Sequence, residues 1–417
     1  MKNILFIALI LSSFFSFAQK GETIIIPPSE ILQQVKIDVV YLASDYLQGR
    51  ETGTVGEGRA ANYIVHRFHQ IGLTPQGESR TWFQEFPFFE ITNPHAPDKG
   101  RIEGKGKNVI GFIDNCAKNT VVIGGHYDHL GMGGSGSLHA GDPEIHNGAD
   151  YNASGIAAMF RIAEYLKNSN LKSNNYMFIA FSGEEKGLFG SKYFASNPTI
   201  DIDLINYMFN MDMVGMLNEE KVLAVQGTGT SPAWKPILER KNLQGLNIKG
   251  RESGVGPSDH TSFYLKDIPV LHFFTGQHSH YHKPSDDSEN LNYQGIVAVS
   301  DFLISLIEHA DGEKLEFTKT KDSSEKKAAA FKVTLGVMPD YVYTGKGMRV
   351  DSVIKGRVGD KGGLKNGDVV IKIGDIEVED IYKYMEGLAK FKKGDTAEVV
   401  ILRGKKSKKK TLKVIFE

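Results

Sequence analysis

The sequence predicts an α/β fold in which a mixed, mostly parallel central sheet is covered by helices on both faces, followed by a small β-rich domain. Three observations support this fold class. Short apolar runs without alternating polar residues are typical of strands buried inside a sheet. Segments with apolar residues at helical spacing lie between these runs. The composition changes after Ala310, and 417 residues are enough for one large domain and a second small one.

The elements of the large domain follow from the spacing of its apolar residues. Helices are expected where apolar side chains recur every three or four positions, over Pro28–Tyr46, Gly56–Ile71, Asn152–Lys167 and Tyr293–Ala310. Buried strands are expected over the apolar runs Thr120–Ile123, Tyr176–Phe181, Tyr207–Met213 and Pro269–Phe274. Helices and strands therefore alternate along the chain, as an α/β domain requires.

The first residues, Met1–Ala18, have the pattern of a signal peptide. Lys2 is followed by a short apolar run, and small residues precede the expected cleavage after Ala18. The run is too short to span a bilayer, and Gln19 rather than a cysteine follows it, so neither an integral membrane anchor nor a lipid anchor is expected. The mature protein is expected to be exported, to the periplasm or to the extracellular space.

The charge balance and the cysteine count narrow the possible classes of protein. Lys and Arg together number 49 and Asp and Glu together number 50, so there is no electrostatic case for binding to nucleic acid. Cys116 is the single cysteine, so no intramolecular disulfide can form. The fold must be stabilised by an apolar core or by metal.

Five short segments carry the residues with catalytic chemistry: HYD, GADYNASG, GEEKG, NMDMVG and YHKPSD. They supply two histidines and three carboxylates, the ligand set of a two-metal hydrolase, at His126, Asp150, Glu185, Asp212 and His282. Glu184 lies beside a ligand and is free to transfer protons. Most of these residues follow predicted strands, and ligands in open α/β sheets collect at that edge.

With these segments, residues from about 30 to 310 resemble peptidase family M28, a family of zinc peptidases that includes bacterial leucyl aminopeptidases. The resemblance implies a zinc exopeptidase-like fold and two Zn²⁺ ions, with Asp150 bridging them. His126 and Asp212 would hold one ion, and Glu185 and His282 the other. Glu184 would be the general base. The same donor atoms also accept Co²⁺ or Mn²⁺.

Supporting roles are expected for further polar residues near these motifs. Asp128, two residues after His126, is expected to fix the tautomer of that imidazole, and we place it with Glu184 in the catalytic group. The resemblance gives Asp286 a supporting position, and likewise Asp259, in the segment PSDHTSF. His260 and Tyr281 lie in the same matched segments and are candidates for supporting the ligands or contacting substrate.

A second resemblance covers the end of the chain. The segment GGLKNGDVVIKIGD, residues 362–375, resembles a PDZ domain of the bacterial protease type. This implies a peptide groove that begins at Leu335, Gly336 and Val337 and receives a peptide C-terminus as an added strand. The predicted domains are a signal peptide over 1–18, a peptidase domain over 19–311, a linker over 312–329 and a PDZ-like domain over 330–417.

Three functions remain open at this point. The favoured one is an aminopeptidase that removes N-terminal residues from peptides with free amino ends. The second is a glutaminyl cyclase-like transferase that uses one zinc ion; such cyclases typically carry Trp before the last histidine, where this chain has Tyr281. The third is a non-catalytic peptide-binding protein, which the complete set of ligands and Glu184 disfavours.

Overall fold

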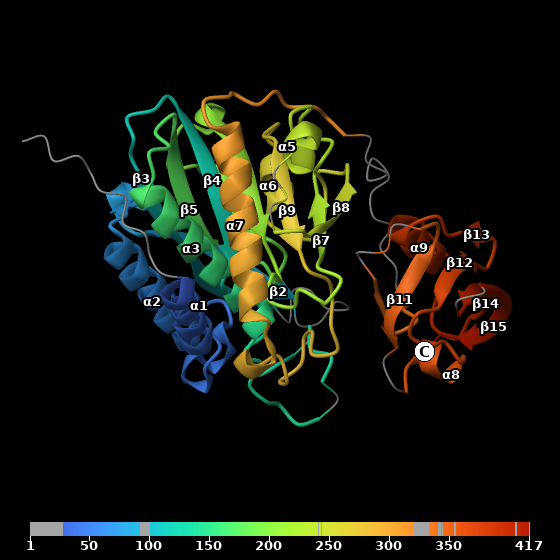
Figure 1. Ribbon diagram of the computed structural model, residues 1–417. Coiled ribbons are helices and arrows are strands. Elements are labelled where there is room, and N and C mark those ends of the chain that lie inside the picture. Colours follow the sequence, from blue (N-terminus) through green and yellow to red (C-terminus); the bar gives the residue numbers. More distant parts are fainter. Residues whose placement is uncertain are drawn as a thin grey trace, which may run out of the picture.

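The structure is a computed structural model of the 417-residue chain. It describes residues 28–91, 101–134, 136–139, 141–240, 242, 244–320, 333–340, 343, 345–353, 356–404 and 407–416. The predicted signal peptide lies outside the described residues. Figure 1 shows a large α/β body, which contains the N-terminal helices, and a smaller one at the C-terminal end of the chain.

The large body is built on one mixed sheet with the strand order β1-β3-β5-β4-β6-β9-β7-β8, and β2 pairs with β3. Its centre consists of four parallel strands: β5 (Asn174–Phe181), β4 (Asn119–His126), β6 (Ile205–Met211) and β9 (Val270–Phe274). These are the four strands that the apolar runs predict. Because they are parallel, their carboxyl ends lie along one edge of the sheet.

Alternate residues of the central strands face two different helix layers. Val121, Phe178 and Phe209 pack under α1 (Pro28–Leu42), α2 (Val55–Ile71), α3 (Gly155–Asn168), α5 (Trp234–Arg240) and α7 (Tyr293–Ala310). Val122 and Met208 face α4 (Phe189–Ser196) and α6 (His260–Tyr264) on the other side. In Figure 1, α7 crosses the sheet beside α3. The predicted arrangement, with helices on both faces of a mixed sheet, is confirmed.

The flanking strands join the centre by antiparallel pairing and complete the predicted mixed sheet, but the apolar runs did not indicate which segments form them. On one side β2 (Phe83–Ile91) and β1 (Thr74–Pro75) pair antiparallel with β3 (Arg101–Ile113), which pairs antiparallel with β5. On the other side β7 (Val222–Gln226) pairs antiparallel with β9 and parallel with β8 (Asn247–Arg251). The four consecutive parallel strands therefore lie at the centre of the sheet, and predicted ligands follow them.

The C-terminal body has a sheet in the order β10-β11-β12-β14-β15, with β13 paired to β12. The strands are β10 (Val337–Pro339), β11 (Met348–Val353), β12 (Val369–Ile373), β13 (Ile376–Glu377), β14 (Thr396–Arg403) and β15 (Lys408–Ile415). Two helices accompany them, α8 (Val358–Lys361) and α9 (Ile381–Leu388). The predicted β-rich second domain is confirmed.

Part of the predicted linker packs against the large body. Leu315 is buried in the core below α7, and the backbone N–H of Thr318 donates to the carbonyl of Thr230 at 2.8 Å. Arg251 of the large body donates a hydrogen bond to the backbone carbonyl of Tyr343, in the C-terminal body, at 2.6 Å.

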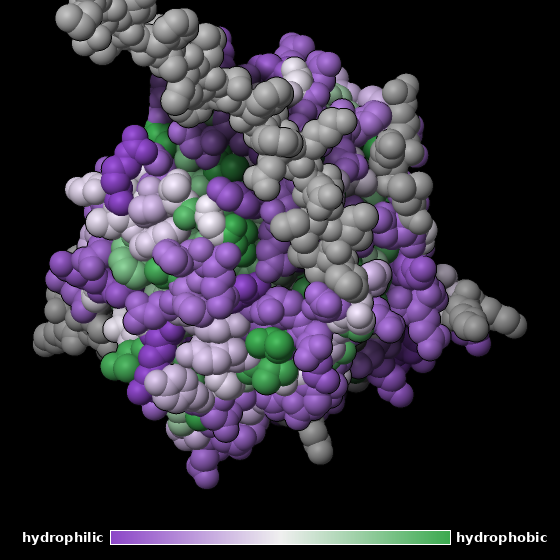
Figure 2. Space-filling model, turned by 60° about the vertical axis from the view of Figure 1, so that its left-hand side comes forward, coloured by the Kyte–Doolittle hydropathy of each residue, from purple (hydrophilic) through white to green (hydrophobic). Residues whose placement is uncertain are grey.

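The described surface is largely polar, and apolar residues lie mainly inside the protein. The face shown in Figure 2 is mostly hydrophilic, with small separate apolar areas. Among the described residues, no helix is both long enough and apolar enough to cross a membrane.

Candidate metal centre

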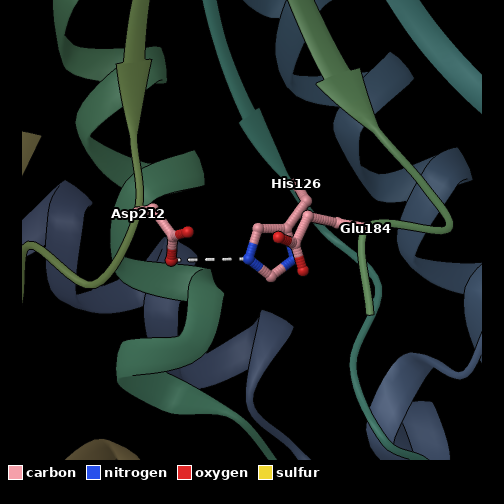
Figure 3. A group of neighbouring side chains, drawn as sticks. All are labelled: His126, Glu184 and Asp212. Carbon is pink, nitrogen blue, oxygen red and sulfur yellow. Dashed lines mark ion pairs between the residues drawn. The ribbon is translucent and has the colours of Figure 1, made fainter. Parts of the chain in front are cut away.

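Three side chains meet at the carboxyl ends of the central strands. His126 is the last residue of β4, Asp212 directly follows β6, and Glu184 lies in the loop after β5. One donor atom from each lies within 4.8 Å of the others, and all three residues are buried. Figure 3 shows them facing a common point. The parallel topology thus gathers residues that are far apart in the sequence.

The ring of His126 is oriented so that one nitrogen is available to a cation. Its Nδ1 lies 3.1 Å from the carbonyl oxygen of Asp128 and therefore carries the donated proton. Its Nε2 lies 3.5 Å from Oδ1 of Asp212. Neither of these two buried atoms has a hydrogen-bond partner among the described residues. Buried, unpaired donor atoms of this kind fit a zinc ion.

Asp128 contacts the His126 ring mainly through its backbone carbonyl, whereas the prediction assigned this contact to its carboxylate. Its carbonyl oxygen, not its carboxylate, is the closer contact of the His126 ring, because the carboxylate oxygen lies 3.6 Å from Nδ1. The carboxylate instead accepts hydrogen bonds from the hydroxyl of Thr52 at 3.0 Å and from the backbone N–H of Glu184 at 3.3 Å. Asp128 therefore connects the loop after β4 to the loop after β5.

Glu185 and His282 form a second pair nearby. Nε2 of His282 lies 3.4 Å from one carboxylate oxygen of Glu185, and His129 lies 2.7 Å from the other. Nδ1 of His282 donates to the carbonyl of Gly136 at 2.7 Å. Burial alone would raise the pKa of Glu185, but His282 and His129 outweigh it and lower this pKa. His129 was not among the predicted site residues.

The structure does not bring Asp150, the predicted bridging ligand, into the group around His126. One oxygen of Asp150 accepts hydrogen bonds from the Ser154 hydroxyl at 2.9 Å and from the N–H of Gly215 at 2.6 Å. The other lies 3.1 Å from Nε2 of His278. The predicted supporting residue Asp286 accepts from the backbone N–H groups of Asp150 at 3.0 Å and of Tyr151 at 3.1 Å. Asp286 thus holds the backbone of this turn.

Tyr151, the next residue, lies between the two pairs. Its ring centroid is 4.7 Å from that of His126 and 5.1 Å from that of His282. Its hydroxyl donates to Oε2 of Glu184 at 3.2 Å. Tyr151 was not among the predicted site residues. One feature of the sequence could have indicated it: Tyr151 is the one large aromatic residue in the segment GADYNASG, whose other residues are small or polar.

The remaining predicted residues lie close behind these groups. The ring of Tyr281 stacks on His282 with centroids 3.9 Å apart. His260 stacks on His272 at 4.5 Å, and Nε2 of His272 is 4.0 Å from the carboxylate of Asp212. Asp259 is fully buried, and this burial raises its pKa to about 7. Tyr281 thus contacts the predicted ligand His282, and His272 contacts the predicted ligand Asp212.

The electrostatics around Glu184 favour the protonated carboxyl group. Burial raises its pKa well above the ordinary value; His126 opposes this effect, while the neighbouring carboxylates of Asp212 and Glu185 add to it. A carboxyl group held beside two candidate metal ligands is a group of the kind that transfers protons during hydrolysis. Glu184 is therefore the titratable group best placed for proton transfer in this site.

Arg50 positions the loops that carry these residues, and no motif in the sequence indicated it. It is fully buried, and its guanidinium donates to the carbonyls of Tyr127 at 2.7 Å, Gly148 at 3.0 Å and Asn147 at 2.5 Å, and also to that of Leu42. Burial lowers the pKa of Arg50 to about 10. The side chain thus links the loop after β4 to the turn before Asp150.

A small pocket with a volume of about 80 Å³ opens beside Asp212. Its walls are mostly aromatic or uncharged, and they consist of Tyr151, Asp212, Met213, Gln226, Pro257, His272, Phe274, Gln277 and Tyr281. Two of these residues, Asp212 and Tyr281, were predicted site residues. A pocket with apolar walls and a few polar groups beside a candidate metal centre is a usual place for a small part of a substrate.

In the C-terminal body the predicted groove residues lead into the edge strand β10: Leu335 and Gly336 precede it, and Val337 is its first residue. Leu335 is fully buried in the core, and its carbonyl accepts from the N–H of Gly359 at 2.6 Å. Gly336 has a φ of 66°, in the left-handed region, and its N–H donates to the Thr334 hydroxyl at 3.0 Å. Val337 is the first residue of β10, which lies at the end of the strand order.

Comparisons with known proteins agree with this description. Residues 108–307 match peptidase family M28, and residues 304–414 match the PDZ domain. Aminopeptidase YwaD of Bacillus subtilis is 27% identical over 174 residues, which cover 39% of this chain and 38% of that protein. The chain spans 74%, 55% and 38% of the length of three curated relatives, YwaD among them.

Solved structures share the fold of the large body. BSAP, a zinc aminopeptidase from Bacillus subtilis, superimposes with a TM-score of 0.53 at 16% identity, covering 68% of this chain and 95% of that one. Porphyromonas gingivalis glutaminyl cyclase gives a TM-score of 0.53 at 16% identity, covering 67% and 98%. Fold and family matches define the class of the large body, a peptidase domain with a zinc exopeptidase-like fold. The chain carries a peptidase family M28 domain followed by a PDZ domain.

Proposed function

We propose that this protein is an exported, zinc-dependent aminopeptidase that hydrolyses N-terminal residues from peptides. The observation that carries the proposal is the pair of buried donor atoms, Nε2 of His126 and Oδ1 of Asp212, that face each other at 3.5 Å beside Glu184. Export rests on the sequence pattern of Met1–Ala18 alone. Among relatives, the aminopeptidase YwaD supports the reaction type.

The chemistry follows from the donor set and from Glu184. A zinc ion bound at this point would lower the pKa of a bound water from about 15.7 towards about 7. Glu184 is placed to accept the proton of that water and to return it to the departing amine. The Tyr151 hydroxyl, which donates to Glu184, orients the carboxylate during this exchange. His126 keeps its free nitrogen towards Asp212 through the hydrogen bond to Asp128.

The metal content is part of the proposal. The sequence predicts two Zn²⁺ ions, replaceable by Co²⁺ or Mn²⁺, and the His126–Asp212 pair supports one of them directly. Glu185 and His282, at 3.4 Å, have the residue types for a second ion. Ser154 and Gly215 bind one oxygen of Asp150, the proposed bridge. The other oxygen is buried without a hydrogen-bond partner among the described residues and lies 3.1 Å from Nε2 of His278.

The pocket beside Asp212 is proposed to receive the N-terminal side chain of the substrate. Its walls include Tyr281, Phe274 and the amide side chains of Gln226 and Gln277. Asp212 is the single acidic residue of this wall and is a proposed ligand, so an uncharged side chain is expected to be preferred. Peptides that begin with leucine or phenylalanine should therefore be cleaved faster than those that begin with aspartate or lysine.

The PDZ domain is proposed to bind the C-terminal ends of peptides. Since β10 lies at the end of the strand order, a peptide strand can be added beside it. Deletion of residues 330–417 should slow turnover of peptides with a free C-terminus more than turnover of amidated ones. Equal rates for both peptides, unaltered by the deletion, would remove this part of the proposal.

A second candidate is a glutaminyl cyclase-like transferase, favoured by the fold that the chain shares with the Porphyromonas gingivalis enzyme. The presence of Tyr281 where such cyclases typically carry Trp argues for the peptidase instead. A cyclase would release ammonia from an N-terminal glutamine and leave the peptide chain intact. A non-catalytic peptide-binding protein would do neither.

The test is release of the N-terminal residue from a peptide panel, with free or acetylated amino ends, by the mature protein. Cleavage that needs a free amine and is lost with chelator supports the aminopeptidase. Indifference to acetylation would point to another peptidase mode. Ammonia release without cleavage would establish the cyclase, and no reaction with any peptide would leave the binding protein.

A further inference from the structure

The segment that follows α7 is bound to the large body before the chain leads towards the C-terminal body (Figure 1). Leu315 is buried in the core, and its N–H donates to the side-chain oxygen of Asn206 at 2.8 Å. The ring of Phe317 packs on that of Tyr264 in α6, with centroids 5.6 Å apart. Residues 313–320, called the strap below, are therefore fixed to this body by both apolar and polar contacts.

The far end of the strap connects two loops at the flank of the sheet. The N–H of Thr318 donates to the carbonyl of Thr230, in the loop after β7, at 2.8 Å. The hydroxyl of Thr320 accepts from the N–H of Gly254, in the loop after β8, at 3.3 Å. The same hydroxyl lies 2.9 Å from that of Tyr264, which also accepts the N–H of Thr320 at 3.0 Å. Thr320 thus joins the loop after β8 to α6.

The two loops carry glycine where the strap and Tyr264 pack against them. A Cβ added to Gly229 would meet the methyl group of Thr320 at 3.2 Å, and one added to Gly254 would clash with the ring of Tyr264. The backbone of each loop therefore lies directly against these side chains. Because interiors are close-packed, a shift of the strap must be felt by both loops.

The loop after β8 continues into the wall of the substrate pocket. Pro257, which follows Gly254 in this loop, lines the pocket. The backbone of Gly256 packs on the other wall, because an added Cβ would lie 2.6 Å from the side-chain oxygen of Gln226. Among the described residues that line the pocket, none belongs to the strap. The strap can therefore act on the pocket only through the loop, residues 252–258.

We propose that the strap sets the shape of this pocket, and that Thr320 and Tyr264 are positioning residues that hold the loop with Pro257 against the N-terminal side chain of the substrate. The proposal rests on the proposed function, because it assumes that the pocket receives this side chain. It also extends the peptidase domain from residue 311, the predicted boundary, to Thr320. The catalytic step itself stays with Glu184.

The test is hydrolysis of two peptides, one beginning with leucine and one with glycine, by the full mature protein. Thr320→Val keeps the size of the side chain and removes the hydroxyl that contacts Gly254 and Tyr264. The value of kcat/KM for the leucine peptide should fall about tenfold, through KM, because the pocket wall is displaced. The glycine peptide places no side chain in the pocket, so its kcat/KM should not change.

Thr318→Val is the matched control. Its side chain is exposed, and its hydrogen bond to Thr230 is made by the backbone, so this variant should behave as wild type with both peptides. Equal losses for the leucine and glycine peptides in Thr320→Val, or no loss for either, would overturn the inference and leave the aminopeptidase proposal intact.

Tyr264→Phe keeps the test decisive if the melting temperature shows that Thr320→Val is not folded. It removes the other hydroxyl of the same contact and should produce the same selective loss with the leucine peptide. Because the two hydroxyls act on each other, the double variant should lose no more than the more affected single variant. Fully additive losses would show that the two residues act separately and would overturn the inference.

Amide hydrogen exchange gives a reading that does not depend on activity. Residues 252–258 should exchange faster in Thr320→Val than in wild type or in Thr318→Val, because the loop has lost its contact with the strap. Unchanged exchange in this loop would overturn the role of the strap whatever the activity. Failure of wild type to release any N-terminal residue would instead overturn the proposed function, and the exchange rates would then decide on the strap alone.

Discussion

The His126–Asp212 pair and the Glu185–His282 pair lie at the same sheet edge and each combine a histidine with a carboxylate, but their surroundings differ. The first pair presents a nitrogen and an oxygen 3.5 Å apart that have no hydrogen-bond partner among the residues described. In the second, Nε2 of His282 is likewise without a hydrogen-bond partner in the described part of the chain, but His129 lies 2.7 Å from the carboxylate of Glu185. A complete ligand set in the sequence therefore need not produce two equivalent metal sites.

The difference between the pairs has an origin in the chain. His126 and Asp212 lie at the ends of the adjacent parallel strands β4 and β6, so the sheet sets their distance. Glu185 and His282 lie in loops, and their approach depends on the turn that contains Tyr151. A strand end is a more rigid support than a loop.

The largest effect should come from breaking the first pair. His126→Ala should lose zinc and reduce N-terminal residue release to background, because the other ligands cannot hold the ion alone. Glu185→Ala should retain the ion and part of the rate. His66→Ala, an exposed histidine on α2, is the control and should behave as wild type. Equal loss in His126→Ala and Glu185→Ala would mean that the pairs are equivalent.

A smaller effect is expected from Glu184→Gln, which keeps the size of the side chain and removes its capacity to accept a proton. The value of kcat should fall by about 10² to 10⁴, the usual contribution of a general base. Zinc content, measured on the same sample, should not change. Wild-type kcat in this variant would sink the assignment of the base, whereas loss of zinc would make Glu184 a ligand.

The smallest expected effect is on the pH dependence of stability, and it comes from His272, whose Nε2 lies 4.0 Å from the carboxylate of Asp212. Burial lowers the pKa of His272 to about 4, below the value of about 6.5 expected in the unfolded chain. The native state therefore excludes a proton that the unfolded state binds. Stability from this source is complete above about pH 6.5 and is lost as pH falls towards 4, by at most about 3 kcal/mol.

Urea unfolding of metal-free protein at several pH values checks this expectation. The decrease in the free energy of unfolding between pH 7.5 and 5 should be smaller in His272→Phe than in wild type. His66→Phe, on the exposed surface of α2, should show the full decrease. An identical pH dependence in all three proteins would show that His272 does not titrate as described.

The centre of the fold could be predicted from the sequence because buried parallel strands have a distinct apolar pattern. The antiparallel flank could not. In β3, Gly104 and Gly106 lie opposite Phe88 and Phe86 of β2, whose rings would clash with any added Cβ at 2.5 Å. Glycine in a strand weakens the pattern that predicts it, although here it makes room for aromatic rings.

The chemistry of the site was predictable by residue type, and the spatial arrangement only in part. Strand ends placed His126 and Asp212 correctly near each other. The contact of Tyr151 with Glu184 and with the His126 and His282 rings depends on the backbone of the turn, and the sequence does not specify that conformation. Among the described residues, the guanidinium of Arg50 donates to backbone carbonyl groups, which any residue supplies, so no motif could reveal it.

Zinc titration of metal-free protein during turnover tests the central claim most directly. Release of the N-terminal residue from a free peptide is followed as zinc is added stepwise. The account predicts no release at first, a rise with added zinc, and saturation once the metal centre is filled. Release that is equally fast without zinc and in the presence of chelator would contradict a metal-dependent aminopeptidase.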